Sequence, residues 1–85
     1  MYRVIFDEEA ISFLERLDKK LKERIFNKIL AAKDRPFHFF ERLSGRTDYK
    51  LRIGNYRVIS GIDVDNEIVH ITLIGHRKNV YEKRR

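Results

Sequence analysis

The stretch that decides the fold is Tyr49-Lys50-Leu51-Arg52-Ile53-Gly54-Asn55-Tyr56-Arg57. Apolar and cationic residues alternate along it, and a Gly-Asn pair interrupts the alternation. Period-two alternation on both sides of a two-residue Gly-Asn break is typical of a β-hairpin with a tight primed turn. The sequence therefore predicts two antiparallel strands that are joined at Gly54 and Asn55.

The position of the turn predicts which residues face each other across the hairpin. The expected pairs are Ile53 with Tyr56, Arg52 with Arg57, Leu51 with Val58 and Lys50 with Ile59. Lys50, Arg52 and Arg57 then share one face of the sheet, and the apolar residues share the other. Like charges directly opposite one another destabilise a hairpin, so the pairing of Arg52 with Arg57 costs stability. An uncompensated cationic cluster on an open sheet face indicates a polyanionic ligand.

Length and composition limit the class of protein. Eighty-five residues suit one small domain, which we expect to span 1–85. The absence of cysteine excludes a disulfide scaffold, a thiolate nucleophile and a Cys-ligated zinc site. The chain does not start with a basic segment followed by an apolar run, and no stretch approaches the length of a membrane span. We therefore expect a soluble, cytoplasmic protein that has no membrane partner.

The net charge of +6 is unevenly distributed. Residues 1–41 hold nine Lys/Arg and eight Asp/Glu, whereas residues 42–85 hold ten and five, which together give the 19 and 13 of the whole chain. A basic second half favours nucleic acid or an acidic protein as the partner. The alternative is a basic surface that serves only solubility.

The segments around the hairpin predict an α+β fold. We expect a strand over 2–6, then two amphipathic helices that begin after Asp7 and Asp18 and form an antiparallel helical hairpin. A third strand over 68–74 pairs Ile62 with Val69 and Val58 with Leu73. The expected architecture is a mainly antiparallel, mixed sheet whose apolar face packs on the N-terminal helical hairpin.

Three phenylalanines, Phe37, Phe39 and Phe40, lie between the second helix and the first hairpin. They either cover the core or form part of a docking surface for a partner chain. The sequence leaves both alternatives open.

Most standard catalytic sites are missing from the sequence. The serines lie in no nucleophile motif, and the three histidines lack metal-ligand spacing. We therefore expect neither a metal nor a cofactor. A cationic surface with one imidazole and one aromatic ring remains, made of Lys50, Arg52, Arg57, His76, Arg77, Lys78 and Tyr81.

Such a surface can cleave RNA without metal. The 2′-OH of the RNA attacks the adjacent phosphorus, so the protein has only to hold the chain in line, stabilise the phosphorane and move two protons. Lys50 is one candidate base, because the arginines crowded around it disfavour its charged form. His76 is the other, because histidine titrates near neutral pH. Tyr81 can stack on an unpaired base. An RNA-binding surface without catalysis explains the same residues.

The whole chain resembles the RelE/ParE superfamily of type II toxins and is most similar to an archaeal-type RelE toxin. The resemblance rests on the strand–helix–helix start, on Leu43 with Gly45, and on the hairpin quoted above. Its sharpest feature is the ending, Ile74-Gly75-His76-Arg77-Lys78-Asn79-Val80-Tyr81. The resemblance implies ribosome-dependent cleavage of mRNA in the A site, hence contact with mRNA and ribosomal RNA, and neutralisation by a RelB-like antitoxin.

The resemblance also implies roles for individual residues. Lys50 and Arg52 match two cations near the scissile phosphate, one of which is the proposed base. Arg57 matches the residue that stabilises charge in the transition state. Arg77 matches a general acid or phosphate ligand, and Tyr81 matches an aromatic residue that orients the substrate base. Arg52 stands where the best-studied relatives have lysine, and arginine is a poor base, so proton abstraction shifts to Lys50 or His76. The alternative within the superfamily is a ParE-like, non-enzymatic inhibitor of DNA gyrase.

Overall fold

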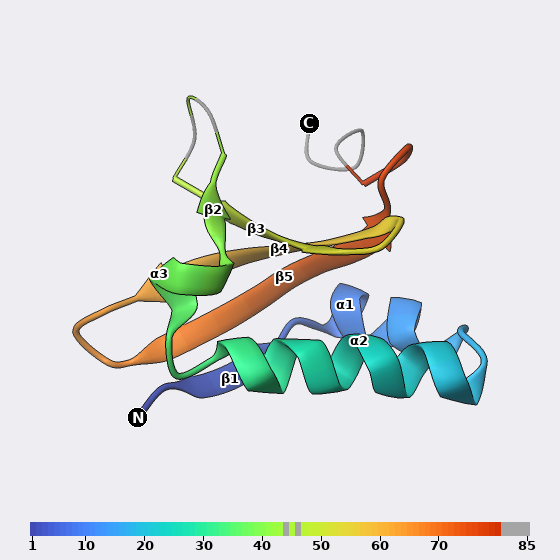
Figure 1. Cartoon of the computed structure of the whole chain (residues 1–85), viewed down its shortest axis with the longest axis horizontal. Coiled ribbons are helices and arrows are strands. Elements are labelled where there is room, and N and C mark those ends of the chain that lie inside the picture. The colour runs from blue at the N-terminus through green and yellow to red at the C-terminus, as the bar shows by residue number, and fades with distance from the viewer. Residues whose placement is uncertain (44, 46, 81–85) are drawn as a thin grey trace.

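The computed structural model describes residues 1–43, 45 and 47–80 of the chain. Its helices and strands, in chain order, are β1 (Arg3–Phe6), α1 (Glu8–Glu15), α2 (Lys19–Ala32), α3 (Pro36–Phe39), β2 (Glu41–Arg42), β3 (Tyr49–Ile53), β4 (Tyr56–Asp63) and β5 (Ile68–His76). The strands form one sheet in the order β1-β5-β4-β3-β2, in which β1 and β5 are parallel and the other neighbours are antiparallel. Helices α1 and α2 run in opposite directions on one side of this sheet (Figure 1). The predicted α+β fold, a mixed sheet on an N-terminal helical hairpin, is confirmed.

Both long helices begin after an aspartate, as the sequence predicts. The Asp18 carboxylate accepts the backbone N–H of Leu21 at 2.9 Å, which satisfies one of the unpaired amides in the first turn of α2. Asp7 precedes α1 but makes no cap bond, and its carboxylate lies 2.5 Å from Nε2 of His70 on β5 instead. This contact ties the start of α1 to the sheet. Among the described residues, no helix has the length and apolar character needed to cross a membrane.

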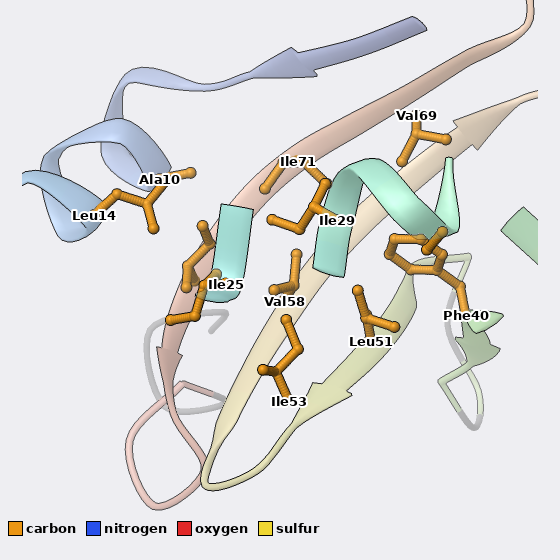
Figure 2. Packing of buried hydrophobic residues seen from close by; sticks show 12 residues of the cluster. Ala10, Leu14, Ile25, Ile29, Phe40, Leu51, Ile53, Val58, Val69 and Ile71 are labelled. Atoms are coloured by element: carbon orange, nitrogen blue, oxygen red, sulfur yellow. The ribbon is translucent and has the colours of Figure 1, made fainter. Parts of the chain in front are cut away.

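The main core lies between α2 and the sheet. Ile25, Ile29 and Ala32 form the buried stripe of α2. In Figure 2, Ile25 and Ile29 lie among side chains from three strands. Full burial of one such aliphatic side chain stabilises a fold by about 1.5–3 kcal/mol. The strand residues of this layer are Leu51, Ile53, Val58, Val69 and Ile71.

The first hairpin has the predicted register. Its pairs are Ile53–Tyr56, Arg52–Arg57, Leu51–Val58 and Lys50–Ile59. At the turn, Gly54 has a φ of +56°, whereas Asn55 is not among the described residues with positive φ. A positive φ at the first central residue only is the pattern of a type II′ turn, which requires glycine there. The predicted primed turn therefore forms, and its glycine is the residue that permits it.

The second hairpin departs from the predicted register at one point. Ile62 pairs with Val69 as predicted, but Val58 pairs with Ile74 and not with Leu73. The prediction of the Val58–Leu73 pair is wrong because it assumed an uninterrupted ladder. The turn itself is closed by Asn66, whose side-chain and backbone N–H groups donate to the Asp63 carboxylate and lower the pKa of that carboxyl.

The interruption is a β-bulge at Thr72. This residue is the extra one on β5, between the Ile59–Leu73 pair and the next pair along β4. Its hydroxyl donates to the backbone carbonyl of Ile59 at 3.2 Å. One extra residue reverses the alternation of the strand. Leu73 therefore lies on the side of the sheet away from the helices, where it packs with Ile59 and Val80 in a second, smaller cluster.

The three phenylalanines around α3 divide between core and surface. Phe40 is only 3% exposed and belongs to the main core. Phe37 is 54% exposed and Phe39 is 44% exposed, and the Phe37 ring contacts Tyr49 edge-on at 5.6 Å between centroids. The core alternative therefore holds for Phe40 alone.

Candidate functional site

The predicted cations of the hairpin lie on the side of the sheet away from α1 and α2. Arg52 of β3 is directly opposite Arg57 of β4, and Arg57 is opposite Gly75 of β5. Lys50 is two residues before Arg52 and therefore shares its face. We call this side of the sheet the open face. Its residues around the site are Lys50, Arg52, Arg57, Ile59, Leu73 and Gly75.

The Arg57 side chain is fixed by the turn. Its Nη1 donates to the carbonyl of Gly54 at 2.8 Å and to that of Tyr56 at 2.9 Å. Arg57 is only 8% exposed although it is charged. Because Nη1 has two hydrogens and uses both, a ligand has to contact Nε or Nη2. The guanidinium is thus held in one orientation before any ligand binds.

Residues 77–80, which follow β5, cover part of the open face. After β5, the N–H groups of Asn79 and Val80 both donate to the carbonyl of His76, which closes one helical turn. Val80 is fully buried over Ile59 and Leu73, with Leu43 at the edge of the cluster. Gly75 permits this approach, since a Cβ added there would lie 3.2 Å from Cβ of Val80.

The same turn brings Arg77 to the tip of the hairpin. The backbone N–H of Arg77 donates to the carbonyl of Asn55 at 2.8 Å. The Arg77 side chain is exposed next to the turn that Arg57 holds from the open face. Lys78 follows and is also exposed. The backbone of Arg77 therefore lies at the hairpin tip, and the membership of its side chain in the cationic surface stays a prediction. Tyr81, predicted to stack on a base, lies outside the described residues.

His76 lies on the other side of the sheet from Lys50 and Arg52. It is paired with Tyr56, and the two rings are 5.6 Å apart in an edge-on contact. The Tyr56 ring in turn contacts Phe13 of α1 at 6.2 Å, so this pair faces the helices. Nδ1 of His76 accepts the backbone N–H of Lys78 at 3.2 Å. In the neutral ring, this bond favours the tautomer that carries its proton on Nε2.

Compensating negative charge is sparse at this site. Glu41 of β2 is directly opposite Lys50, yet no ion pair joins them. Within residues 1–43, 45 and 47–80, the ion pairs that we find involve neither Lys50 nor Arg52, Arg57 or Arg77. In the same part of the chain, no three metal-ligating side chains gather into one group.

One cation at the hairpin tip was not predicted from the sequence. Arg24 of α2 lies against Gly54, and a Cβ added to that glycine would be 3.0 Å from Nη2 of Arg24. Arg24 is on the exposed part of an amphipathic helix, where sequence periodicity predicts only contact with solvent. Its proximity to the turn depends on how α2 packs on the sheet, and no local signal carries that information.

One known protein family matches nearly the whole chain. Residues 4–81 match the family described as the ParE toxin of type II toxin–antitoxin systems, parDE. No curated protein sequence matches the chain significantly.

Solved structures of toxins have the same fold. The toxin–antitoxin complex RelBE2 of Mycobacterium tuberculosis matches with 23% identity over 89% of this chain and 98% of that chain, with a TM-score of 0.80. The archaeal RelE–RelB complex of Pyrococcus horikoshii matches with 24% identity over 89% and 94%, with a TM-score of 0.75. The isolated RelE toxin of Escherichia coli matches with 22% identity over 99% and 95%, with a TM-score of 0.76. At these identities the likeness extends to the fold alone.

Proposed function

We propose, given that the chain belongs to the ParE toxin family of type II toxin–antitoxin systems, that it is a ribosome-dependent endoribonuclease of the cytoplasm. Its substrate is mRNA in the ribosomal A site, and its cleavage stops translation. The observation that supports this proposal is the cluster of Lys50, Arg52 and Arg57 on the open face, which has no carboxylate partner among the described residues. A phosphodiester is the ligand that such a cluster binds best.

The proposed reaction needs no nucleophile from the protein. The RNA 2′-OH attacks the adjacent phosphorus, the bond from phosphorus to the 5′ oxygen breaks, and a cyclic phosphate and a 5′-OH result. One proton leaves the 2′-OH and one is delivered to the 5′ oxygen. Arg57 stabilises the charge on the phosphorane, because its guanidinium is already oriented by two carbonyls and needs little reorganisation. Arg77 binds the same phosphate from the tail.

The two candidate bases differ in position. Lys50 lies on the open face with Arg52 and Arg57, so it can reach the 2′-OH of a nucleotide held there. His76 faces the helices, and its Nδ1 is occupied by the N–H of Lys78. This arrangement favours Lys50 as the base, and it leaves delivery of the proton to the 5′ oxygen to Arg77, for which the resemblance implies a general acid. Comparing the cleavage rates of Lys50→Ala and His76→Ala across pH tests the assignment. The variant that lacks the base should lose the rise of the rate with pH that ionisation of the base causes.

Primer extension on a translated mRNA, with and without ribosomes, tests the activity itself. We expect cuts only when ribosomes are present, and we expect Arg57→Ala and Arg77→Ala each to lower the cleavage rate about 100-fold. Thermal unfolding of each variant shows whether its fold is intact. Wild-type rates in both folded variants would remove these two arginines from the site, and no cut by the wild-type protein would remove the nuclease activity.

The family match favours a second candidate function, which is inhibition of DNA gyrase without catalysis. A gyrase supercoiling assay separates the two functions. The nuclease proposal predicts unchanged supercoiling at protein concentrations that stop translation. Inhibited supercoiling together with intact mRNA would replace the nuclease by the gyrase inhibitor.

The proposed partner is a RelB-like antitoxin with an acidic, amphipathic segment. Between β1 and α2 lies a groove of about 530 Å³ in which Phe26 is 40% exposed and Leu30 is 38% exposed. β1 is an edge strand, so its outer side is open to pairing with another chain. Arg3 and Lys33 at the groove attract negative charge. The matched complexes from Mycobacterium tuberculosis and Pyrococcus horikoshii contain antitoxins, which supports a partner of this kind.

A further inference from the structure

The tip of the first hairpin is contacted by arginines from two layers of the molecule. On the open face, Arg57 donates to the Gly54 carbonyl at 2.8 Å. From the helix layer, the Arg24 guanidinium lies against the same glycine, with Nη2 3.0 Å from where a Cβ would be. Arg77 is anchored to the next residue of the turn, Asn55. Three arginines from α2, β4 and the tail therefore surround a two-residue turn.

Among the described residues, no ion pair that we find compensates the positive charge of Arg24, Arg57 and Arg77. In the part of the chain that the structure describes, the ion pairs join Met1 to Glu67, Lys33 to Asp34 and His70 to Asp7, all away from the tip. The Arg24 and Arg57 guanidiniums both lie against Gly54, and like charges near one another destabilise a fold unless an anion lies near them. The open-face cations account for one phosphate. Arg24 approaches the turn from α2, on the other side of the sheet, so it is available to a different anion.

Candidate site residues lie on both sides of the hairpin tip. His76 lies on the helix side of the sheet, as Arg24 of α2 does, whereas Lys50 and Arg52 are on the open face. A single nucleic-acid strand that contacts both groups has to pass around the hairpin tip. Arg24 is positioned to bind such a strand on the helix side of the hairpin tip.

We propose that Arg24 forms a second phosphate-binding position, which takes a backbone phosphate of the RNA strand next to the one held on the open face. This inference rests on the proposed function only in that RNA is the ligand. Arg24 touches neither the scissile phosphate nor the transferred protons, so it is a binding and positioning residue. It bends the strand around the tip and brings it toward His76.

The experiment measures RNA binding without cleavage. A fluorescent single-stranded RNA with 2′-O-methyl groups throughout lacks the nucleophile, and anisotropy gives its affinity over a range of salt concentrations. Loss of one phosphate contact should lower the slope of log affinity against log salt by about 0.7. At 0.1 M salt, this slope corresponds to about fivefold weaker binding by Arg24→Ala. Arg24→Lys should keep the slope, because it keeps the charge.

Lys19→Ala is the matched control. It removes one positive charge from the same helix at another exposed position, and we expect its affinity to stay within twofold of wild type. Equal behaviour of Arg24→Ala and Lys19→Ala would overturn the inference. Unchanged RNA binding by Arg24→Ala, combined with weaker binding of the antitoxin, would also overturn it. The anion that Arg24 binds would then be a carboxylate of the antitoxin. Absence of mRNA cuts by the wild-type protein would instead overturn the nuclease, and a changed salt slope would still establish the Arg24 position.

Discussion

At the scale of single residues, the proposed function makes the orientation of one guanidinium important for binding a phosphate. Arg57 uses Nη1 to donate to the carbonyls of Gly54 and Tyr56, so Nε and Nη2 are the nitrogens with which it would bind a phosphate. Lysine can keep the charge but cannot satisfy two carbonyls and a phosphate in one plane. The orientation of Arg57, and not only its charge, should therefore matter for catalysis.

Arg57→Lys tests that conclusion. We expect cleavage to fall about 100-fold and the free energy of unfolding to fall by about 1.5–3 kcal/mol, because one charged hydrogen bond to a carbonyl is lost. Arg35→Lys, at an exposed arginine before α3, should change neither quantity. Primer extension and urea unfolding give the two measurements. Wild-type cleavage by Arg57→Lys would mean that charge alone is sufficient.

The cations of the hairpin could be predicted from the sequence, but the full geometry of the site could not. Strand alternation is local, so it places Lys50, Arg52 and Arg57 on one face without further information. The side of the sheet that His76 occupies depends on its pairing with Tyr56. This pairing is set by the β-bulge at Thr72, which no turn motif in the sequence predicts. The contact of Arg24 with Gly54 depends on helix packing. Such tertiary contacts leave no periodic signal in the sequence.

At the scale of elements, the bulge in β5 and the turn after it form the floor of the candidate site, which is the apolar cluster of Ile59, Leu73 and Val80. The bulge at Thr72 turns Leu73 to the open face, and Val80 packs over it. The predicted ladder had assigned Leu73 to the main core. The alternating apolar pattern could not correct this, because it is compatible with either face once a residue is inserted. The apolar cluster under the tail is therefore the part of the fold that the sequence did not predict.

Gly75→Ala should disrupt this floor. Its Cβ would lie 3.2 Å from Cβ and 3.3 Å from Cγ2 of Val80, so the turn that carries Arg77 has to move. We expect a loss of about 1–3 kcal/mol in the free energy of unfolding, as for other overpacked sites, and weaker cleavage.

Gly61→Ala is the matched control, because no described atom lies within 4 Å of its added Cβ. It should be neutral or raise stability by up to about 1 kcal/mol through a less flexible unfolded chain. Urea unfolding of both variants and the wild type gives the comparison. Equal stabilities for the two alanine variants would show that Val80 adjusts without cost.

At the scale of the whole molecule, two surfaces of different chemistry lie on different parts of the fold. The open face and hairpin tip are cationic, whereas the groove between β1 and α2 is apolar. Composition indicated the first surface, because the excess of positive charge lies in residues 42–85. It gave no sign of the second, because the groove forms only when β1 and α2 come together. Substitutions should therefore separate cleavage from neutralisation.

Leu30→Glu is the substitution that should separate them. It places a negative charge in the groove, where we expect it to repel an acidic antitoxin and to lose apolar contact, weakening binding at least 10-fold. Leu30 is 38% exposed and lies on α2, away from the cations of the open face, so cleavage of mRNA should remain at the wild-type rate. Asn27→Glu introduces the same charge at an exposed position of α2 that does not line the groove.

Titration calorimetry with the acidic product of a neighbouring reading frame measures the binding, and growth during co-expression measures neutralisation. Asn27→Glu should bind as the wild type does and be neutralised, whereas Leu30→Glu should remain toxic in the presence of the antitoxin. Equal affinities for the two variants would place the antitoxin on another surface. Reduced cleavage by Leu30→Glu alone would instead show that the groove and the cationic site are coupled through α2, because Arg24 on the same helix lies against the hairpin tip.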